Sequence, residues 1–573
     1  MTLNDLLEKG YFPKELPPPF NTKQFSTYFE TKSNFKGYKG NKGKSNYAEF
    51  SIPKLNFSRT KVAIINPYNY LILAEVIKNN WNDIEAIYNG STITTSLPAV
   101  NTNSFKTDKS FREFKEIALV ESLGKDIMLK TDVARFYSSI YTHSIPWAIH
   151  TKAVAKNDRG NSLFGNVLDA SIRNCQDEQT NGIPIGPITS LIIAEILLTS
   201  IDKQLVSKYS LKGKRYIDDY MLFFDNSINA EEFLQNLQIL LMNFQLEINN
   251  TKTNIEKLPY ELEEIWLTEL STFFATSSSI TQKLFLTKLY SKVLTLVKKY
   301  PNKFVIKYLI HIVMNYYIED ENWILFQTYL LNLTKLEPSI LPETLKIILS
   351  YHKVNKFSLQ EIKKFYIDLI NVHILKENHF EVAWSLWSLV ELNQKINASL
   401  ADIVLSSDDS CSKLIILHMK IKNLIDGNLT TLQMIQGNIQ SDDLYNKKWL
   451  FTYESFHKNW LSVNTVPHPV LGDTFFKKLH DNNISFYDET IKVAYFDIEE
   501  LKVNDLTNFQ FDSSDLIDRL DNMRSKISDA EDFDEIKDTY QDLLSVFSEF
   551  IEDTNEEFTD HIKKLVEKKE EYE

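Results

Sequence analysis

Two adjacent aspartates stand at the centre of a short apolar and aromatic segment, and carboxylates at this spacing can bind metal ions. The segment runs Arg215-Tyr216-Ile217-Asp218-Asp219-Tyr220 and continues as Met221-Leu222-Phe223-Phe224. The apolar runs on both sides predict two short strands joined by a hairpin, with the aspartates at its turn. Neighbouring carboxylates repel each other unless a cation compensates them. Two Mg²⁺ ions held in this way are what nucleotidyl transfer uses; the simpler alternative is a turn with no metal.

A third carboxylate follows an apolar run about 85 residues upstream of the pair. Ile127-Met128-Leu129 should form a buried strand, and Asp132 should emerge at its end. An aspartate after a strand also serves commonly as a helix N-cap, so Asp132 alone is ambiguous. An aromatic residue, Tyr137, follows five positions later.

Two further segments complete the pattern. Between the aspartates, the segment from Gln179 to Ser190 contains two glycines and two prolines, which predict a fixed turn, and Leu191 to Leu205 reads as a helix. After the hairpin comes Leu246-Glu247-Ile248-Asn249-Asn250-Thr251-Lys252-Thr253.

In this order and spacing, the four segments resemble the core motifs of reverse transcriptases. The resemblance implies that Asp132, Asp218 and Asp219 hold two Mg²⁺ ions, with Mn²⁺ as the alternative ion. It also implies that the carbonyl of Val133 is an additional metal ligand.

The same resemblance assigns roles around the nucleotide. Tyr137 would pack under the sugar and exclude a 2′-hydroxyl, and Lys252 would protonate the departing pyrophosphate. Phe136 and Gly186 would adjoin the nucleotide. One departure is Ile185, where many members carry glutamine, so a polar contact near the nucleotide is missing.

Basic residues upstream are candidates for binding the triphosphate. Arg59 and Lys61 open an apolar strand that ends near Pro67, and arginine suits phosphate through its bidentate geometry. Arg112 opens a later helix. A solvated strand end is the equally simple interpretation of the first two.

Two other stretches resemble one branch of this family, the bacterial defence-associated and abortive-infection enzymes. They are the proline-rich segment from Gly10 to Phe20 and the string from Tyr141 to Ala148. The branch implies a role in phage defence and dNTPs as substrates. It implies an RNA template, such as a non-coding RNA, or a single-stranded DNA product primed from a tyrosine of the protein. A second protein encoded in the same operon is a candidate partner.

Composition favours a soluble cytoplasmic protein with no membrane partner. The chain has 573 residues, 43% of them hydrophobic, and no apolar run of the roughly 18 residues that a membrane span needs. The first residues lack a basic region and an apolar signal core. Two cysteines, Cys175 and Cys411, are too few for a disulfide framework or a zinc site.

The net charge of −14 is concentrated at the C-terminal end. Residues 1–259 carry 30 Lys and Arg against 27 Asp and Glu, whereas residues 501–573 carry 9 against 22. The acidic total is therefore compatible with a phosphate-binding cleft in the first half.

The expected fold class is an α+β palm and fingers domain, residues 1–259, followed by an all-α, helical-repeat-like half. That half divides into residues 260–430, an aromatic-rich helical region over 431–500, and an acidic helical tail over 501–573. The tail is either a solvated hairpin or an element for homo-oligomerisation or a basic partner. Seven apolar-periodic stretches predict helices without a clear repeat: Thr281–Lys299, Phe304–Tyr317, Trp323–Leu336, Leu341–His352, Leu359–Leu375, Phe380–Leu392 and Cys411–Ile425.

Two functions of different classes follow from these patterns. The first is a DNA polymerase that either copies RNA or works without a conventional template. The second is a catalytically silent scaffold that binds nucleic acid within a defence complex. The presence of Asp132, Asp218, Asp219 and Lys252 together favours the enzyme.

Overall fold

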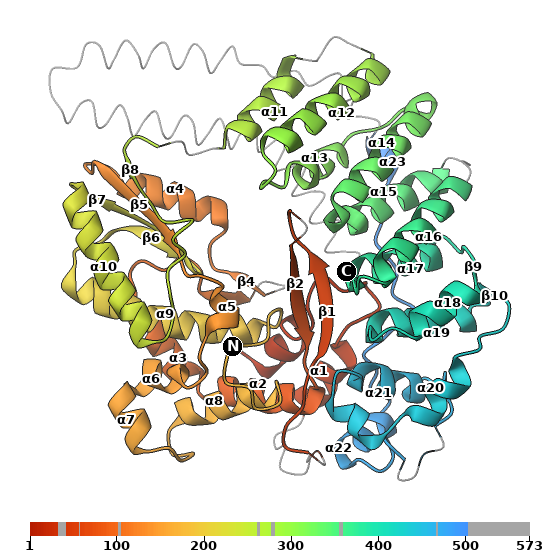
Figure 1. The fold of residues 1–573 in the computed structure, drawn as a ribbon, viewed down its shortest axis with the longest axis horizontal. Coiled ribbons are helices and arrows are strands. Elements are labelled where there is room, and N and C mark those ends of the chain that lie inside the picture. The colour runs from red at the N-terminus through yellow and green to blue at the C-terminus, as the bar shows by residue number, and fades with distance from the viewer. Residues whose placement is uncertain are drawn as a thin grey trace.

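A long β-hairpin stands between a mixed α/β half and an all-α half of the molecule (Figure 1). The computed structural model describes residues 1–501 apart from 32–39, 41, 57, 101–104, 261–263, 277–280, 355–358, 464 and 466–467. The hairpin pairs β1 (Ala48–Pro53) with the antiparallel β2 (Arg59–Ile64). The predicted fold class is confirmed; the acidic tail, beyond residue 501, lies outside the described residues.

The candidate metal ligands lie on a four-stranded antiparallel sheet of order β6-β7-β5-β8. Residues alternate between its two faces, as expected for strands. Leu129 and Leu222 belong to the main apolar core, whereas Met128 and Met221 belong to a smaller cluster on the opposite face. The strands are β5 (Ile127–Asp132), β6 (Lys212–Tyr216), β7 (Asp219–Phe224) and β8 (Asn254–Lys257).

Helices cover both faces of this sheet. On the main-core face lie α9 (Ile188–Lys208) and α10 (Ser227–Asn243), and α9 is buried along most of its length. On the other face, α4 (Phe111–Glu121) places Phe114 and Ala118 against the smaller cluster. The apolar run predicted as a helix from Leu191 to Leu205 is therefore the buried support of the sheet.

The fingers and the N-terminal arm consist of short helices and small strands. Two of these helices follow each other directly: α2 ends at Asn79 and α3 begins at Trp81, because Asn80 leaves helical geometry at φ −110°, ψ 20°. The elements are η1 (Asp5–Lys9), α1 (Lys23–Glu30), α2 (Pro67–Asn79), α3 (Trp81–Tyr88), β3 (Pro98–Val100), β4 (Phe105–Thr107), α5 (Phe136–Ser139), α6 (Ser144–His150), α7 (Lys152–Asn157) and α8 (Phe164–Asn174).

The second half contains all seven helices predicted for it, and two of them end four residues earlier than predicted. The helix predicted to reach Tyr317 ends at Val313, and the one predicted to reach Ile425 ends at Ile421. Its elements are α11 (Ile265–Thr276), α12 (Gln282–Lys299), α13 (Val305–Val313), η2 (Asp320–Asn322), α14 (Trp323–Leu336), η3 (Pro338–Ile340), α15 (Leu341–Val354), α16 (Gln360–Ile374), α17 (His379–Glu391), β9 (Ile396–Asn397), α18 (Ala398–Leu405), α19 (Ser410–Ile421) and β10 (Ile425–Asp426).

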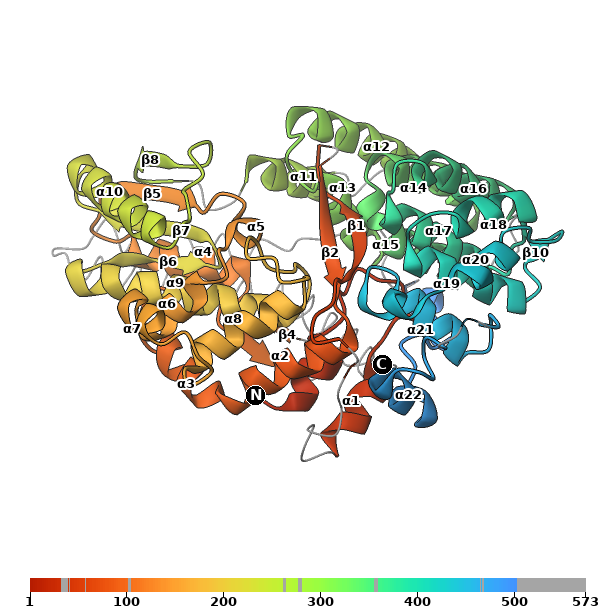
Figure 2. The ribbon, with the colours of Figure 1, turned by 60° about the horizontal axis from the view of Figure 1, so that its bottom comes forward.

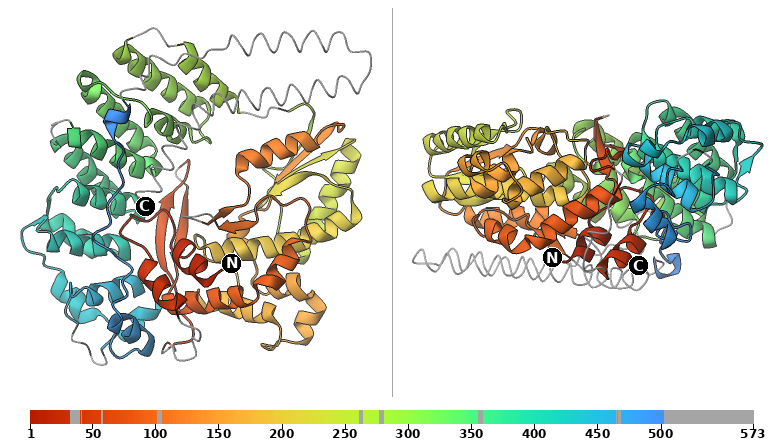
Figure 3. Two further views of the ribbon diagram at one scale, coloured as in Figure 1. Left: turned by 180° about the vertical axis from the view of Figure 1, so that it is seen from behind. Right: turned by 90° about the horizontal axis from the view of Figure 1, so that it is seen from below.

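The last described region returns to the N-terminal arm (Figures 2 and 3). The carbonyl of Phe486 accepts a hydrogen bond from Asn21, and Asp488 donates to Pro19. The region comprises α20 (Leu432–Asn438), η4 (Ser441–Tyr445), α21 (Trp449–His457), α22 (Thr474–Asp481) and α23 (Ile498–Leu501). None of the helices in the described part of the chain is both long and apolar enough to span a membrane.

Candidate active site

Strand register brings the three aspartates to one end of the sheet. Asp132, the last residue of β5, lies directly opposite Asp219, the first residue of β7. Because Tyr216 also pairs with Asp219, only Ile217 and Asp218 form the turn between β6 and β7. The hairpin predicted from the sequence is therefore present, with Asp218 at its tip.

The aspartates disfavour one another's charge. Burial, together with the charges of Asp219 and Asp132, raises the pKa of Asp218 to about 6. Burial also raises the pKa of Asp219; Lys252 opposes this rise, and Asp132 adds to it. A cation among these carboxylates would relieve the repulsion.

Lys252 supplies part of the compensating charge. Its Nζ donates to Oδ2 of Asp132 at 2.5 Å, and the lysine side chain is 64% exposed whereas that of Asp132 is 5% exposed. This hydrogen bond raises the pKa of Lys252, so the ammonium stays protonated at neutral pH. Among the described residues, the buried Oδ1 of Asp132 has no hydrogen-bond partner and is available as a ligand.

The donor set fits Mg²⁺, although the side chains are not preassembled around an ion. In the described part of the chain, no three His, Cys, Asp or Glu side chains are already arranged to hold a metal. The aspartates offer the oxygen ligands that Mg²⁺ requires. The carbonyl of Val133 is a further ligand candidate. Val133 lies opposite Ile248 in an antiparallel bridge, and the hydrogen bonds of this bridge are made by the residues on either side: the Asn249 N–H donates to the Asp132 carbonyl and the Ala134 N–H to the Glu247 carbonyl. Val133 and Ile248 therefore form a pair without hydrogen bonds between them, so the Val133 carbonyl makes none across the bridge.

Tyr137 and Phe136 follow Asp132 on the short helix α5 and differ in exposure. Phe136 is 3% exposed within the main core, which gives it a packing role beneath the site. Tyr137 is only partly buried, and its carbonyl accepts a hydrogen bond from Ile183. Burial first, and then the charge of Asp218, raise the pKa of the Tyr137 phenol, which therefore stays neutral beside the carboxylates.

The Gly-Pro loop is held against both the palm and the fingers. A Cβ on Gly182 would lie 3.1 Å from the carbonyl oxygen of Ser138, and a Cβ on Gly186 would lie 3.0 Å from Pro13. Their φ angles of 78° and 119° also favour glycine. The carbonyl of Ile185 accepts a 2.7 Å hydrogen bond from the N–H of Ala63 in β2, so this loop is hydrogen-bonded directly to the fingers.

Each of the three basic candidates has an acidic partner. Arg59 makes a two-pronged ion pair with Glu381 of α17, whose side chain is 1% exposed. Lys61 pairs with Glu49, and Arg112 with Glu116, but both cations are more than 60% exposed. Arg59 is thus fixed between the two halves, whereas Lys61 and Arg112 remain accessible to a ligand.

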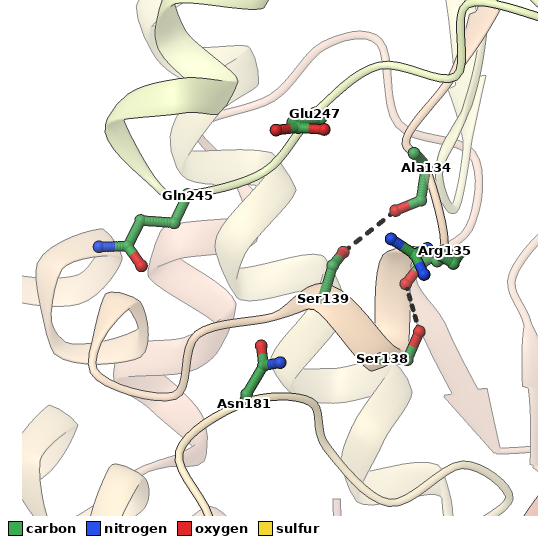
Figure 4. A pocket seen from close by; sticks show the side chains of 7 residues that line it. All are labelled: Ala134, Arg135, Ser138, Ser139, Asn181, Gln245 and Glu247. Atoms are coloured by element: carbon green, nitrogen blue, oxygen red, sulfur yellow. Dashed lines mark hydrogen bonds between the residues drawn. The ribbon is translucent and has the colours of Figure 1, made fainter.

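A cavity of about 360 Å³ opens beside the turn that follows Asp132 (Figure 4). Arg135, Ser138, Asn181 and Glu247 are among the residues that line it. Arg135 adopts a left-handed backbone conformation, with φ 46°, at the start of α5. Nothing in the sequence distinguishes Arg135, since an exposed arginine beside a motif carries no distinctive pattern.

A buried ionic group beneath the hairpin was also missed. Arg215 of β6 contacts Glu195 and Asp202 of α9, and all three side chains are fully buried. The available signal was the seven-residue spacing of the two acids, which places them on one face of an otherwise apolar helix.

Comparison with known proteins identifies part of the chain. Residues 52–287 match the family described as reverse transcriptase (RNA-dependent DNA polymerase). This stretch contains the candidate ligands, the Gly-Pro loop and Lys252, so the chain contains a reverse transcriptase domain. The comparison with curated proteins found no match.

Solved structures with a detectable likeness include telomerases from two Candida species. Apo telomerase from Candida tropicalis shows 11% identity and a TM-score of 0.30, with 72% of each chain covered. Telomerase from Candida albicans, in complex with a fragment of telomeric RNA, shows 12% identity and a TM-score of 0.27, covering 68% of this chain and 67% of that one. A Candida tropicalis telomerase truncated of its C-terminal domain shows 14% identity and a TM-score of 0.28; the match covers 38% of this chain and 51% of that one. At these TM-scores the likeness supports no functional conclusion.

Proposed function

We propose that this protein is a DNA polymerase of the reverse transcriptase type that uses dNTPs and two divalent metal ions. The observation that carries the proposal is the convergence of Asp132, Asp218 and Asp219 at one end of the sheet, with Lys252 bonded to Asp132. Clustered carboxylates with raised pKa values are typical of functional sites.

The reaction follows from the roles of these groups. A 3′-hydroxyl, or a protein hydroxyl at priming, attacks the α-phosphorus of a dNTP and loses its proton to water. The new P–O bond forms as the α–β phosphoanhydride bond breaks, and pyrophosphate leaves. Mg²⁺ bound to the aspartates and the Val133 carbonyl would stabilise the charge on the attacking and leaving oxygens. Lys252, which stays protonated, would give a proton to pyrophosphate. Tyr137 would hold the sugar and exclude a 2′-hydroxyl.

The silent scaffold is the weaker alternative. A scaffold has no need to retain three clustered carboxylates, because the raised pKa values of Asp218 and Asp219 show that the site disfavours their charge when no cation is present. Lys252 neutralises only one of them.

Template use distinguishes two forms of the polymerase. Ile185 provides an apolar side chain where many reverse transcriptases have glutamine, which favours relaxed template use. We therefore propose template-independent, protein-primed synthesis as one form and copying of a dedicated RNA as the other. The resemblance of residues 10–20 and 141–148 to defence enzymes supports a role against phage.

The test is incorporation of each labelled dNTP with Mg²⁺ by purified, nuclease-treated protein, analysed on denaturing gels before and after protease. Label that protease releases from protein indicates protein priming. Incorporation only after RNA from the host cells is restored indicates templated synthesis. Asp218→Asn should abolish both, whereas Asp225→Asn, at an exposed aspartate beyond β7 that pairs with Lys125, should abolish neither. Incorporation by Asp218→Asn would refute the assignment.

The defence role has a separate test. Cells that carry the gene in its native operon should plate a broad panel of phages less efficiently than cells that carry the Asp218→Asn version. Equal plating of every phage would refute the role in defence without affecting the polymerase proposal.

A further inference from the structure

Beneath the catalytic hairpin lies a closed group of buried charges. The guanidinium of Arg215 donates to both carboxylate oxygens of Glu195 at 3.1 Å and to Oδ2 of Asp202 at 2.8 Å. Burial alone would lower the pKa of Arg215, but its ion pairs with Asp202 and Glu195 raise it, so the arginine stays charged. The group joins the helix α9 to the strand that leads into the turn.

This group fixes both backbone polar atoms of Ile217. Nη1 of Arg215 donates to the Ile217 carbonyl at 2.7 Å. The Ile217 N–H donates to Oγ of Ser96 at 2.6 Å, and the Ser96 hydroxyl donates in turn to Oε1 of Glu195 at 2.7 Å. Glu195 therefore supports both hydrogen bonds, one through Arg215 and one through Ser96.

The residue held in this way is in a strained conformation. Ile217 has φ 53°, which is unusual for a β-branched residue and persists only where surrounding contacts enforce it. Glycine is the preferred residue at this position of a two-residue hairpin. Asp218 follows directly, so the orientation of the Ile217–Asp218 peptide fixes the direction in which Asp218 leaves the turn.

We propose that Arg215, Glu195 and Ser96 form a positioning device that holds the strained turn at Ile217 and thereby orients Asp218 and Asp219. None of the three touches the reacting atoms; they act through the backbone of Ile217. The metal-binding consequence rests on the proposed polymerase function, whereas the control of the turn does not.

Ser96→Ala tests the device with the smallest disturbance, because it removes one hydroxyl and leaves the Arg215–Glu195 ion pair in place. Ser91→Ala is the matched control: the Ser91 hydroxyl donates to Asp202 in the same group at 2.8 Å, whereas the hydrogen bonds of Ile217 in the described structure go to Ser96 and Arg215. We expect Ser96→Ala to weaken Mn²⁺ binding, measured by electron paramagnetic resonance, about tenfold and to lower kcat about 10- to 100-fold with little change in KM for dNTPs. Ser91→Ala should match the wild type in both measurements.

A second variant separates positioning from general destabilisation. Ile217→Gly adopts a positive φ without strain, so in this background Ser96→Ala should reduce Mn²⁺ affinity and kcat by a smaller factor than in the wild-type background. If Ser96→Ala lowers the melting temperature as Ser91→Ala does and leaves kcat and Mn²⁺ affinity unchanged, the device is merely structural and the proposal is overturned.

Hydrogen exchange distinguishes failure of this proposal from failure of the polymerase assignment. The Ile217 amide should exchange faster in Ser96→Ala than in the wild type or Ser91→Ala, whether or not the protein incorporates nucleotides. Equal exchange in all three proteins would overturn the positioning device. Absence of metal binding and incorporation in the wild type would instead refute the proposed function.

Discussion

At the scale of single residues, folding and the proposed catalytic role place opposite demands on Asp218. The proposed polymerase reaction needs its carboxylate ionised, whereas burial and two neighbouring aspartates favour its neutral form. The consequence is a site that is unfavourable without cations, with Lys252 as the partial compensation on Asp132. Catalytic carboxylates of this kind reduce stability in exchange for function.

Asp218→Asn should make the metal-free protein more stable while it abolishes polymerisation. One pKa unit corresponds to about 1.4 kcal/mol, so relief of the rise from 3.8 to about 6 should increase the free energy of unfolding by up to about 3 kcal/mol at pH 8. Thermal unfolding in EDTA measures this change, with Asp225→Asn as the control. A lower melting temperature for Asp218→Asn in EDTA would contradict the prediction.

Added Mg²⁺ should stabilise the wild-type protein and have little effect on Asp218→Asn. An ion that binds only the folded state raises its stability, by about 2.7 kcal/mol at a hundredfold excess over Kd. Thermal unfolding across a Mg²⁺ titration, with matched KCl to hold ionic strength, provides the measurement. Equal shifts in both proteins would show that the ions act elsewhere.

Tyr137→Ala should relax the choice of sugar. Tyr137 lies partly exposed on α5 beside Asp218, and loss of its ring would remove the steric barrier to a 2′-hydroxyl. We expect the ratio of kcat/KM for a dNTP to that for the matching ribonucleotide to fall about 10- to 100-fold. Tyr141→Ala, at the next tyrosine along the chain, is the control and should keep the wild-type ratio. An unchanged ratio for Tyr137→Ala would show that Tyr137 does not exclude the 2′-hydroxyl.

At the scale of elements, local sequence patterns predicted the strands and helices of the palm. They could not predict which side chains pair when the residues are far apart in the chain. The apolar runs of β5 and β7 and the Gly-Pro loop are local signals, so the hairpin and the helix after the loop could be inferred. The partner of Arg59 is Glu381, 322 residues away, and nothing in the strand around Arg59 indicates it. The fixing of Ile217 likewise depends on side chains from three separated segments.

Arg59→Met tests whether this residue is structural. Removal of the guanidinium leaves the nearly fully buried Glu381 with only His373, at 3.9 Å, as an ionisable partner, which should cost about 3 kcal/mol of stability. Lys61→Met, which breaks an exposed pair, should cost less than about 1 kcal/mol. Denaturant unfolding measures both, and the KM for dNTPs should be unchanged in Arg59→Met. A raised KM without loss of stability would restore the triphosphate-binding role predicted from the sequence.

At the scale of the whole molecule, the two ends of the described chain close on each other. The segment 484–488 bonds to the N-terminal arm through Asn21, Gln24 and Pro19. Apolar packing is continuous from Leu6 to Ile498, so the arm, the fingers and the last helices share one core. The divisions predicted near residues 259, 430 and 500 stay predictions, because sequence composition does not show which segments pack together.

Glu454 on α21 anchors this closing segment and makes its stability depend on pH. Its carboxylate accepts hydrogen bonds from the Phe486 N–H and the Ser485 hydroxyl, and burial raises its pKa to about 7, against 4.5 for an ordinary glutamate. Between these values the folded protein binds more protons than the unfolded chain. The contribution of Glu454 to stability is therefore fully present below about pH 4.5 and is lost as the pH rises through about 7.

Glu454→Gln should remove this dependence while retaining an acceptor oxygen. We expect the free energy of unfolding of the wild type, minus that of Glu454→Gln, to fall by about 2–3 kcal/mol between pH 5 and pH 8. Urea unfolding across this range measures the difference. Burial lowers the pKa of His418 and His457 to about 4, which acts in the opposite direction, but both residues are present in each protein and cancel in the comparison. The prediction is contradicted if this difference in free energy of unfolding stays constant or grows with pH. Glu454 would then be ionised at neutral pH, and its hydrogen bonds to the closing segment, rather than burial, would control its charge.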